Sequence, residues 1–181
     1  MTDDHSRSAL VQIVADFVSR HPDVELEVHC ALGTRFEAAL KTDALDLAVF
    51  EVPEPMRGDE VLREDELVWM CRRDRDLRSV KVLPVAIFDR NCWWRDVALS
   101  GLEAAGRHYR IAFTSESTVG VRAAVSAGIA AGLLSAGDDT AELVPLPDMD
   151  FRRESFLVLR RRQGATGNIC HAMCEAIRGA F

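Results

Sequence analysis

Long apolar runs are missing from this sequence of 181 residues, and so is a secretory leader. No apolar stretch approaches the roughly 20 residues that a membrane-spanning helix needs. The amino-terminal MTDDHSRS has neither the basic start nor the apolar segment of a signal peptide. These absences predict a soluble, cytoplasmic protein without a membrane partner.

Cysteine is scarce and irregularly spaced. An odd number of cysteines, five, stands at positions 30, 71, 92, 170 and 174, and no pair has the C-x-x-C spacing of many metal and redox sites. Disulfide frameworks are typical of small secreted domains. We therefore expect reduced thiols.

Basic clusters are also few. The 22 Lys and Arg residues are outnumbered by 29 Asp and Glu residues, which gives a formal net charge of −7. Duplex affinity comes largely from neutralising several phosphates, and the basic run at residues 160–162 is too short for that. The composition weighs against nucleic-acid binding by this chain.

The sequence does contain enough apolar material for one good core or two small lobes, because 48% of its residues are hydrophobic. Helical spacing of apolar residues predicts a helix over residues 6–20. Alternation of apolar and polar residues over 24–30 predicts a half-exposed strand. Thr34 and Glu37 form a capping box that opens a second helix, and the apolar run 47–50 predicts a strand covered on both faces.

A Pro-rich stretch at residues 51–55 indicates the first crossing into a second lobe. The elements expected after the crossing are strands at 64–71 and 83–88, a helix at 92–105, a return connection at 141–147, a strand at 155–160 and a closing helix at 168–181. Asn91 is expected to cap the helix at 92–105, and Gly106 to close it.

Two neighbouring tryptophans, Trp93 and Trp94, lie in the first turn of the helix expected at 92–105. Large aromatic side chains mainly supply apolar burial, so packing is favoured over ligand stacking.

Residues 110–134 form the unit around which the rest is arranged: a short buried strand, a polar turn, a helix and a second strand. Ligands bind at the edge of an α/β sheet where such a strand hands over to a helix. Unpaired N–H groups at the helix start, beside the hydroxyls of Thr114, Ser115 and Ser117, suit a carboxylate or another small anion. The alternative is that Ser115 or Ser117 only caps the helix.

Metal binding has weak support. Cys170 and Cys174 share a helix face, but two thiols do not make a tetrahedral zinc site, and His171 points about a quarter-turn away. The acidic residues 138–139 and 148–150 lack the pattern of a calcium loop. We expect a buried or dimer-facing helix and solvated loops, with no metal and no cofactor.

The order of these elements, together with several short sequence matches, resembles the effector-binding domain of LysR-type transcriptional regulators. The resemblance extends over nearly the whole chain, and its strength lies in the order and spacing of the matches. They are HPDVEL at 21–26, GT at 33–34, LDLAV at 45–49, LVW at 67–69, CWWR at 92–95, AGR at 105–107, IAFTSES at 111–117 and VSAGI at 125–129.

The resemblance implies an α/β fold like that of type 2 periplasmic binding proteins. Two Rossmann-like lobes would be joined by two crossover segments, with a ligand cleft between them. Lobe I would comprise about residues 1–51 and 150–181, and lobe II about residues 52–149.

Two departures from the family accompany the resemblance. The sequence matches neither the helix-turn-helix domain nor the linker helix of the regulators, so DNA would be bound only through a domain that these residues do not include. The family's domain also begins with a strand before the part matched by residues 2–5. The first lobe is therefore expected to lack one strand, leaving backbone groups to a neighbour, water or rearrangement.

The resemblance also implies a set of ligand contacts around the cleft. Independent support from helix starts and strand ends is best at Thr34, Thr114 and Ser115. The full set is Thr2, Asp3, Thr34, Phe50, Glu51, Phe88, Thr114 and Ser115.

The function expected from these observations is a ligand-sensing regulatory module, a homodimer or higher homo-oligomer that binds a small polar or anionic effector. In the dimer, residues 6–20 would lie beside residues 117–127 of the partner. An enzyme or solute-binding protein on the same fold is the alternative. The serines lack the G-x-S-x-G elbow of a hydrolase, and the absent leader opposes an exported binding protein, so we expect no enzyme.

Overall fold

The computed structural model describes Met1 and residues 9–31, 33–90, 92–138, 141–147 and 149–181. The chain divides into two compact units, which we call unit 1 (Met1–Glu64 and Phe156–Phe181) and unit 2 (Asp65–Ser155). The chain passes from one unit to the other twice, once within each of two long strands. Each unit is described separately below.

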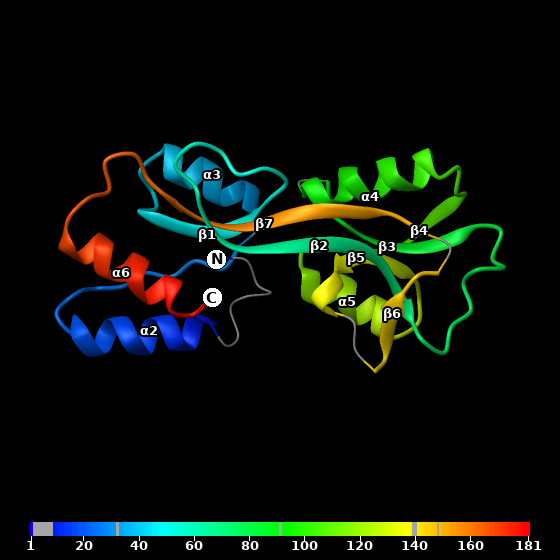
Figure 1. Cartoon of the computed structure of the whole chain (residues 1–181), viewed down its shortest axis with the longest axis horizontal. Coiled ribbons are helices and arrows are strands. Elements are labelled where there is room, and N and C mark those ends of the chain that lie inside the picture. Colours follow the sequence, from blue (N-terminus) through cyan, green and yellow to red (C-terminus); the bar gives the residue numbers. More distant parts are fainter. Residues whose placement is uncertain (2–8, 32, 91, 139–140, 148) are drawn as a thin grey trace. The chain divides into compact units, whose positions relative to one another are not determined.

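Unit 1 combines helices with a short antiparallel ladder (Figure 1). Strand β1 pairs with β7 along its whole length, from Leu47 opposite Arg161 to Val52 opposite Phe156. The elements of unit 1 are α2 (Ala9–Arg20), α3 (Gly33–Lys41), β1 (Leu47–Val52), the first part of β2 (Glu60–Arg72), the second part of β7 (Arg152–Arg161) and α6 (Asn168–Arg178).

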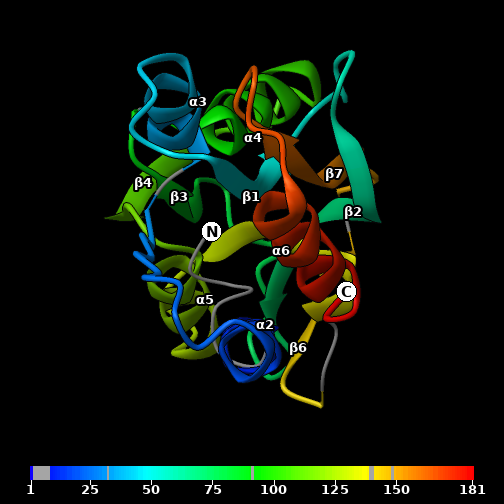
Figure 2. The same cartoon turned by 90° about the vertical axis from the view of Figure 1, so that its left-hand side faces the viewer.

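Helices cover both faces of the β1–β7 ladder. On one face α2 and α6 pack together, as Figures 1 and 2 show, and their apolar side chains meet Val49, Leu157 and Leu159. On the other face α3 packs against Ala48 and Phe50. The strand predicted at residues 47–50 to be covered on both faces is confirmed.

The strand predicted over residues 24–30 is wrong: this segment runs as irregular chain between α2 and α3 (Figure 1). Its alternating sequence suits a strand, but a strand also needs a hydrogen-bonded neighbour. Among the described residues, its backbone bonds are those of Val24 to His21 and of His29 to Met1. Residues 24–30 therefore have the alternating sequence of a strand, but within the described part of the chain they are not paired with a neighbouring strand.

Unit 2 is built on a larger sheet in which β2 is antiparallel to β5 and β6, whereas β3 is parallel to β4 and β5. Within this unit the strand order is β6-β2-β5-β3-β4. The elements that follow β2 are β3 (Leu83–Phe88), α4 (Trp93–Ala104), β4 (Tyr109–Ser115), α5 (Thr118–Ser126), β5 (Ala131–Ser135), the 3-10 turn η1 (Ala136–Asp138) and β6 (Leu143–Pro145).

One continuous core fills unit 2. Helices α4 and α5 lie on opposite faces of its sheet (Figure 1), and all six residues of β3 are buried. Gly132 in β5 permits close packing of α5, because an added Cβ would lie 2.7 Å from a methyl group of Val125. Trp94 is buried in this core, as its packing role predicted, with its ring edge-on to Phe88.

The expectation of a buried strand β4 is wrong, and the expectation that Gly106 ends α4 is confirmed. The strand predicted to be buried lies at the sheet edge, and Ile111 is 45% exposed there. Gly106, at φ +60°, closes α4 as predicted: Arg107 N–H donates to the carbonyl of Leu102 and Gly106 N–H to that of Glu103. Asn91, expected to cap this helix, lies outside the described residues.

The boundary between the units falls at Glu64 and Asp65, later than the Pro-rich stretch expected to be the crossing. Residues 53–59 stay with unit 1, because Asp59 at their end is bonded to Arg160 of β7. The expected return connection at 141–147 contains the short strand β6. No helix within the described parts of the chain is long and apolar enough to cross a membrane.

Candidate functional site

The start of α5 is organised by two serine hydroxyls. Ser117 is the N-cap, and its Oγ accepts a hydrogen bond from Val119 N–H at 3.2 Å. The Oγ of Ser115 accepts one from Ser117 N–H at 3.1 Å. Of the two serines considered as caps, Ser117 is the one that caps the helix, and Ser115 supports the turn just before it.

Gly120 makes room for Ser115 above the first turn of α5. A Cβ at position 120 would lie 2.2 Å from the Oγ of Ser115 and 2.8 Å from its Cβ. Such contacts are too close for real atoms, so a side chain here would displace Ser115. Sequence reasoning missed Gly120, although a glycine in the first turn of a helix is itself unusual enough to indicate a close approach.

Thr114, Ser115 and Phe88 are brought together by the parallel pairing of β3 and β4. Thr114 lies opposite Ile87, and Ser115 opposite Phe88. The Thr114 side chain is exposed, whereas Phe88 is buried against Trp94, with ring centroids 5.2 Å apart. Thr114 therefore offers its hydroxyl to solvent at the strand end, and Phe88 supports the strand beneath.

In unit 1, Thr34, Phe50 and Glu51 gather near the start of α3. Thr34 is exposed in its first turn and Glu51 is half-buried on β1. Phe50 is buried under Gly33, where an added Cβ would lie 3.4 Å from the phenyl ring. Thr2 and Asp3, also expected as contacts, lie outside the described residues.

The capping box predicted from Thr34 and Glu37 is wrong. Helix α3 begins at Gly33, so Thr34 lies inside its first turn and not at the cap position. The Glu37 carboxylate instead accepts a hydrogen bond from Arg160 Nη1 at 2.9 Å. Glu37 thus bonds to a residue 123 positions away along the chain and not to the backbone at the start of its own helix.

Arg160 is the centre of a partly buried charged cluster in unit 1. Its guanidinium donates to both carboxylate oxygens of Asp59, at 2.5 and 2.7 Å, and lies 4.8 Å from the ring centroid of Phe50. The Asp59 side chain is only 1% exposed. Burial by itself would raise the pKa of Asp59, but hydrogen bonds from Arg160 and Met56 N–H, with the charge of Arg160, hold that pKa below its ordinary value.

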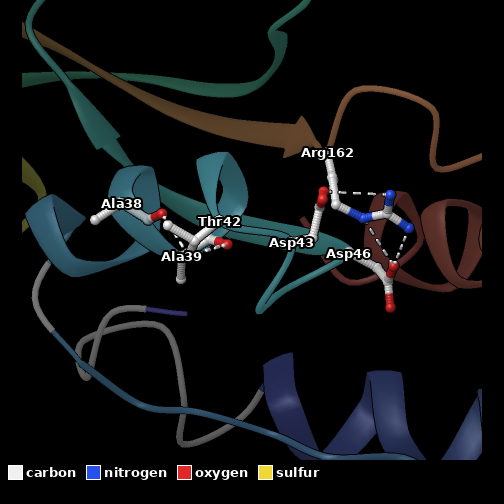
Figure 3. A network of polar contacts seen from close by, with 6 residues as sticks. All are labelled: Ala38, Ala39, Thr42, Asp43, Asp46 and Arg162. Carbon is white, nitrogen blue, oxygen red and sulfur yellow. Dashed lines mark hydrogen bonds and ion pairs between the residues drawn. The ribbon is translucent and has the colours of Figure 1, made fainter.

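A second arginine of the same strand end fixes the start of β1 (Figure 3). Arg162 donates to the Asp46 carboxylate from Nη2 at 2.8 Å and lies 3.5 Å from that of Asp43. The sequence offered one hint of both clusters: a run of arginines, 160–162, directly follows the apolar residues of β7.

The thiols of α6 are separated from His171, as their spacing indicated. Cys174 is buried and Cys170 half-buried, whereas His171 is exposed with its Nε2 3.7 Å from Glu175. Burial, with a smaller effect from Cys170, raises the pKa of the Cys174 thiol. Within the described residues no three His, Cys, Asp or Glu side chains are grouped closely enough to hold a metal ion.

Comparisons with known proteins identify the family. Residues 1–179 match the family model described as LysR substrate binding domain. The chain is 30% identical over 133 residues to the HTH-type transcriptional regulator DgdR of Burkholderia cepacia, a match that covers 74% of this chain and 45% of DgdR. The chain therefore spans less than half the length of the curated relatives that it matches.

Solved structures show the same fold. Full-length HypT of Salmonella typhimurium, a hypochlorite-specific LysR-type transcriptional regulator, matches with a TM-score of 0.76 and 13% identity over 98% of this chain and 66% of HypT. The CcmR regulatory domain of Synechocystis PCC6803, in complex with 2-PG, matches with a TM-score of 0.69 and 15% identity over 97% and 92%. The expected α/β fold, like that of type 2 periplasmic binding proteins, is confirmed. The chain belongs to the LysR substrate-binding domain family.

Proposed function

We propose that this chain is the effector-binding regulatory domain of a cytoplasmic LysR-type transcriptional regulator. It binds a small polar or anionic metabolite and modulates transcription through a DNA-binding domain that these 181 residues do not include. Membership of the family and the likeness to DgdR support a regulatory role and not a catalytic one. The net charge of −7 supports the absence of DNA binding by the chain itself.

The observation that carries the proposal is the exposed Thr114 hydroxyl beside the start of α5 in unit 2. The first N–H groups of a helix have no partners within it, and they attract negative charge. The Ser117 hydroxyl accepts from one of them, that of Val119, and the Ser115 hydroxyl accepts from another, that of Ser117. The N–H groups of Thr118 and Gly120, with Thr114 Oγ1, form the set of donors that would suit a carboxylate or phosphate, the kind of group for which an effector pocket would be built.

Glu116 adds a condition on the ligand. It is exposed in the same turn, and its charge disfavours a bare anion close by. A ligand that also carries a hydroxyl or amino group could donate a hydrogen bond to the Glu116 carboxylate, and it would fit this turn better than a ligand with an anionic group alone. In unit 1 we propose Thr34 as the best-placed contact, and the remaining predicted contacts are Thr2, Asp3, Phe50, Glu51, Phe88 and Ser115.

A ligand screen followed by calorimetry tests the proposal. A metabolite that binds only the folded chain raises its melting temperature. For any such ligand, Thr114→Val removes one hydrogen-bonding group at nearly constant volume and should weaken binding about five- to 150-fold, or roughly 1 to 3 kcal/mol. Ser115→Ala should weaken binding and also cost about 1 kcal/mol of folding stability, because it loses the bond to Ser117 N–H.

Ser100→Ala is the matched control, since Ser100 is exposed on α4 of the same unit. It should leave both affinity and stability unchanged. Unchanged affinity in both the Thr114 and Ser115 variants would place the site elsewhere.

Homodimerisation is the second part of the proposal. Val11 and Val18 of α2 are 68% and 41% exposed, and Val119 at the start of α5 is 50% exposed. A twofold contact of α2 with α5 of the partner would cover both apolar surfaces. Val11→Lys should shift sedimentation at tens of micromolar toward monomer, whereas Val61→Lys on β2, 41% exposed in the wild-type chain, should not. A wild-type chain that sediments only as monomer would contradict this part.

A further inference from the structure

A group of cations lies at the end of the unit 2 sheet where β3 and β4 begin. We call residues 72–82, with Arg107 and His108, the basic surface. It contains six Arg and Lys residues against two Asp residues, whereas the remainder of the chain has 16 Arg and Lys against 27 Asp and Glu. Positive charge is therefore concentrated on one surface of an acidic chain.

Hydrogen bonds join the two segments of the basic surface. Leu83 N–H donates to the carbonyl of His108 at 2.8 Å. Arg107 Nη2 donates to the carbonyl of Leu77 at 3.0 Å and lies 3.4 Å from that of Arg78. The Leu77 side chain is 5% exposed and packs in the core of unit 2. These contacts fix the loop against the sheet, so its cations need little ordering when a partner binds.

Two arginine side chains of the loop lie across the end of α5. A Cβ added at Gly128, which follows this helix, would lie 3.1 Å from Cγ of Arg75 and 3.4 Å from Cδ of Arg72. Cations beside the last turn of a helix interact favourably with its dipole. That interaction accounts for charges at positions 72 and 75, but it requires none at Lys81 or Arg107.

The two aspartates of the basic surface are matched by arginines of the same loop. Arg72 Nε lies 2.8 Å from the Asp74 carboxylate, and Arg78 Nε lies 3.1 Å from that of Asp76. All four side chains are at least 42% exposed, so these ion pairs stay hydrated and contribute little to stability. Both aspartates are thus already paired.

The cations at Arg75 and Lys81 are exposed, and within the described part of the chain no carboxylate lies at ion-pair distance from either of them. Val82, beside Lys81, is 46% exposed. Glu142 borders the surface, where its carbonyl accepts from Arg73 N–H at 2.8 Å, and its charge opposes the binding of an anion. The positive charge still predominates, so a complementary partner carries several negative charges and an apolar group.

We propose that the basic surface docks an acidic segment of another protein. Carboxylates of that segment pair with Arg75 and Lys81, and an apolar side chain covers Val82. The planar fork of arginine matches the two oxygens of a carboxylate. A nucleic acid fits less well, because its continuous row of phosphates would also face Asp74 and Asp76 and would gain nothing from Val82. A polypeptide can place its carboxylates selectively.

This surface is separate from the proposed effector site. Thr114 and Ser115 lie at the far end of β4, about 20 Å from Tyr109 at about 3.3 Å per residue. An effector site that failed its own test would therefore leave the docking proposal unaffected.

A peptide titration followed by fluorescence anisotropy tests the proposal on the chain as it exists. The probe is labelled acetyl-Asp-Asp-Leu-Glu-Asp-Leu-Asp-amide, and the control peptide has Asn and Gln in place of Asp and Glu. We expect saturable binding on the order of 10 to 100 μM near physiological salt, and binding at least about tenfold weaker for the control peptide.

Charge reversal on the protein locates the binding. Arg75→Glu with Lys81→Glu should weaken binding of the acidic peptide at least about tenfold. The matched control is Arg90→Glu with Arg153→Glu, which changes the net charge equally at two exposed positions of the same unit and should change affinity less than about twofold. If the first variant unfolds more easily, Arg75→Gln with Lys81→Gln removes both charges without adding acids and should still weaken binding about threefold or more.

The chain has two lysines, which allow a footprint of the bound peptide. Lys81 belongs to the basic surface, and Lys41 is exposed at the end of α3 in unit 1. Acetylation measured by mass spectrometry should slow at Lys81 when the acidic peptide is added and stay unchanged at Lys41. Equal protection of both lysines, or equal weakening by the two charge-reversed variants, would overturn the proposal. Tighter binding of a random DNA duplex than of the peptide would overturn it in favour of a nucleic acid.

Discussion

The two units of this chain are stabilised in different ways. Unit 2 buries its apolar side chains in one continuous core, with Trp69, Leu133 and the whole of β3 inside. Unit 1 holds two smaller clusters, one on each face of the β1–β7 ladder, beside a cavity of about 500 Å³. A similar alternation of helices and strands has produced one continuous core in unit 2 and a divided core in unit 1.

Charged pairs between distant segments occur in both units. In unit 1, arginines at or just after the end of β7 and in α6 bond to carboxylates more than a hundred positions away: Arg160 to Asp59, Arg162 to Asp46 and Arg178 to Glu60. In unit 2, Arg152 of β7 bonds to Glu66 of β2, 86 positions away, whereas Arg78 pairs with Asp76 only two positions away. In unit 1 these ties accompany an apolar core that is divided into two clusters.

The largest expected difference is in the cost of core truncation. Ile87 of β3 is 1% exposed within the continuous core, and Ile87→Ala should cost about 3 to 5 kcal/mol. Ile13 of α2 is 4% exposed but borders the cavity, so Ile13→Ala removes fewer contacts and should cost about 2 kcal/mol or less. Denaturant unfolding followed by circular dichroism measures both.

Tryptophan fluorescence assigns each loss to its unit, because Trp69, Trp93 and Trp94 all belong to unit 2. Ile87→Ala should move the fluorescence transition, and Ile13→Ala should move it less. Equal costs for the two substitutions would mean that the cavity does not loosen the packing around Ile13.

The sequence predicted best those elements whose stability is local. Strand β3 has the predicted bounds, and Gly106 and Ser117 close and open their helices as expected. Each of these depends on residues within a few positions, where spacing and side-chain chemistry determine the result. The predicted hydroxyl-bearing turn before α5 belongs to this class, which is why its capping was foreseen.

Long-range features could not be predicted in the same way. The alternation at residues 24–30 is typical of a strand, but whether a strand forms depends on a neighbour that the pattern does not specify. The capping box was wrong because Glu37 bonds to Arg160, 123 positions away. Gly120 was missed for a related reason: its role depends on where the side chain of Ser115 lies in three dimensions.

The next largest effect concerns the buried carboxylate of unit 1. Asp59→Asn leaves the guanidinium of Arg160, 14% exposed, without its main counter-charge and should cost about 2 to 4 kcal/mol. The double change Asp59→Leu with Arg160→Met should cost less than the single one, because, among the described residues, the only charge that then loses its partner is that of Glu37, which is 42% exposed and stays hydrated. A double variant that is less stable than Asp59→Asn would show that the pair itself stabilises unit 1.

The pH dependence of unit 1 follows from the same group. The folded pKa of Asp59 is lowered, so its stabilisation is complete above the unfolded value near 4 and is lost as the pH falls through the folded pKa. The hydrogen bond from Arg178 lowers the pKa of Glu60 in the same direction. Below about pH 4, hydrogen exchange in β1 and α6 should therefore accelerate before exchange in β3, and Asp59→Asn should reduce that difference.

The smallest effect compares two helix ends that share a residue in the left-handed conformation and the hydrogen bond made by the residue after it. Helix α4 ends with Gly106 at φ +60°, and α3 with Asp43 at φ +58°. In α3 the N–H of Ala44 donates to the carbonyl of Ala39 at 2.9 Å, the counterpart of the bond from Arg107 to Leu102 in α4. Unit 2 thus has the favoured residue at this position and unit 1 a strained one.

Substitutions at these two positions, Asp43→Gly and Gly106→Ala, should change the free energy of unfolding in opposite directions. Asp43→Gly relieves the left-handed conformation and should stabilise the chain by about 0.5 to 1 kcal/mol, whereas Gly106→Ala should cost about 1 kcal/mol. The ion pair of Asp43 with Arg162 opposes the first gain only weakly, because Asp43 is 75% exposed and the two groups are 3.5 Å apart. Asp43→Asn, which removes the charge but keeps a residue tolerant of this conformation, should be nearly neutral in urea unfolding. If Asp43→Gly and Asp43→Asn destabilise equally, the pairing with Arg162 outweighs the backbone strain, and unit 1 depends on its charged ties even at this exposed helix end.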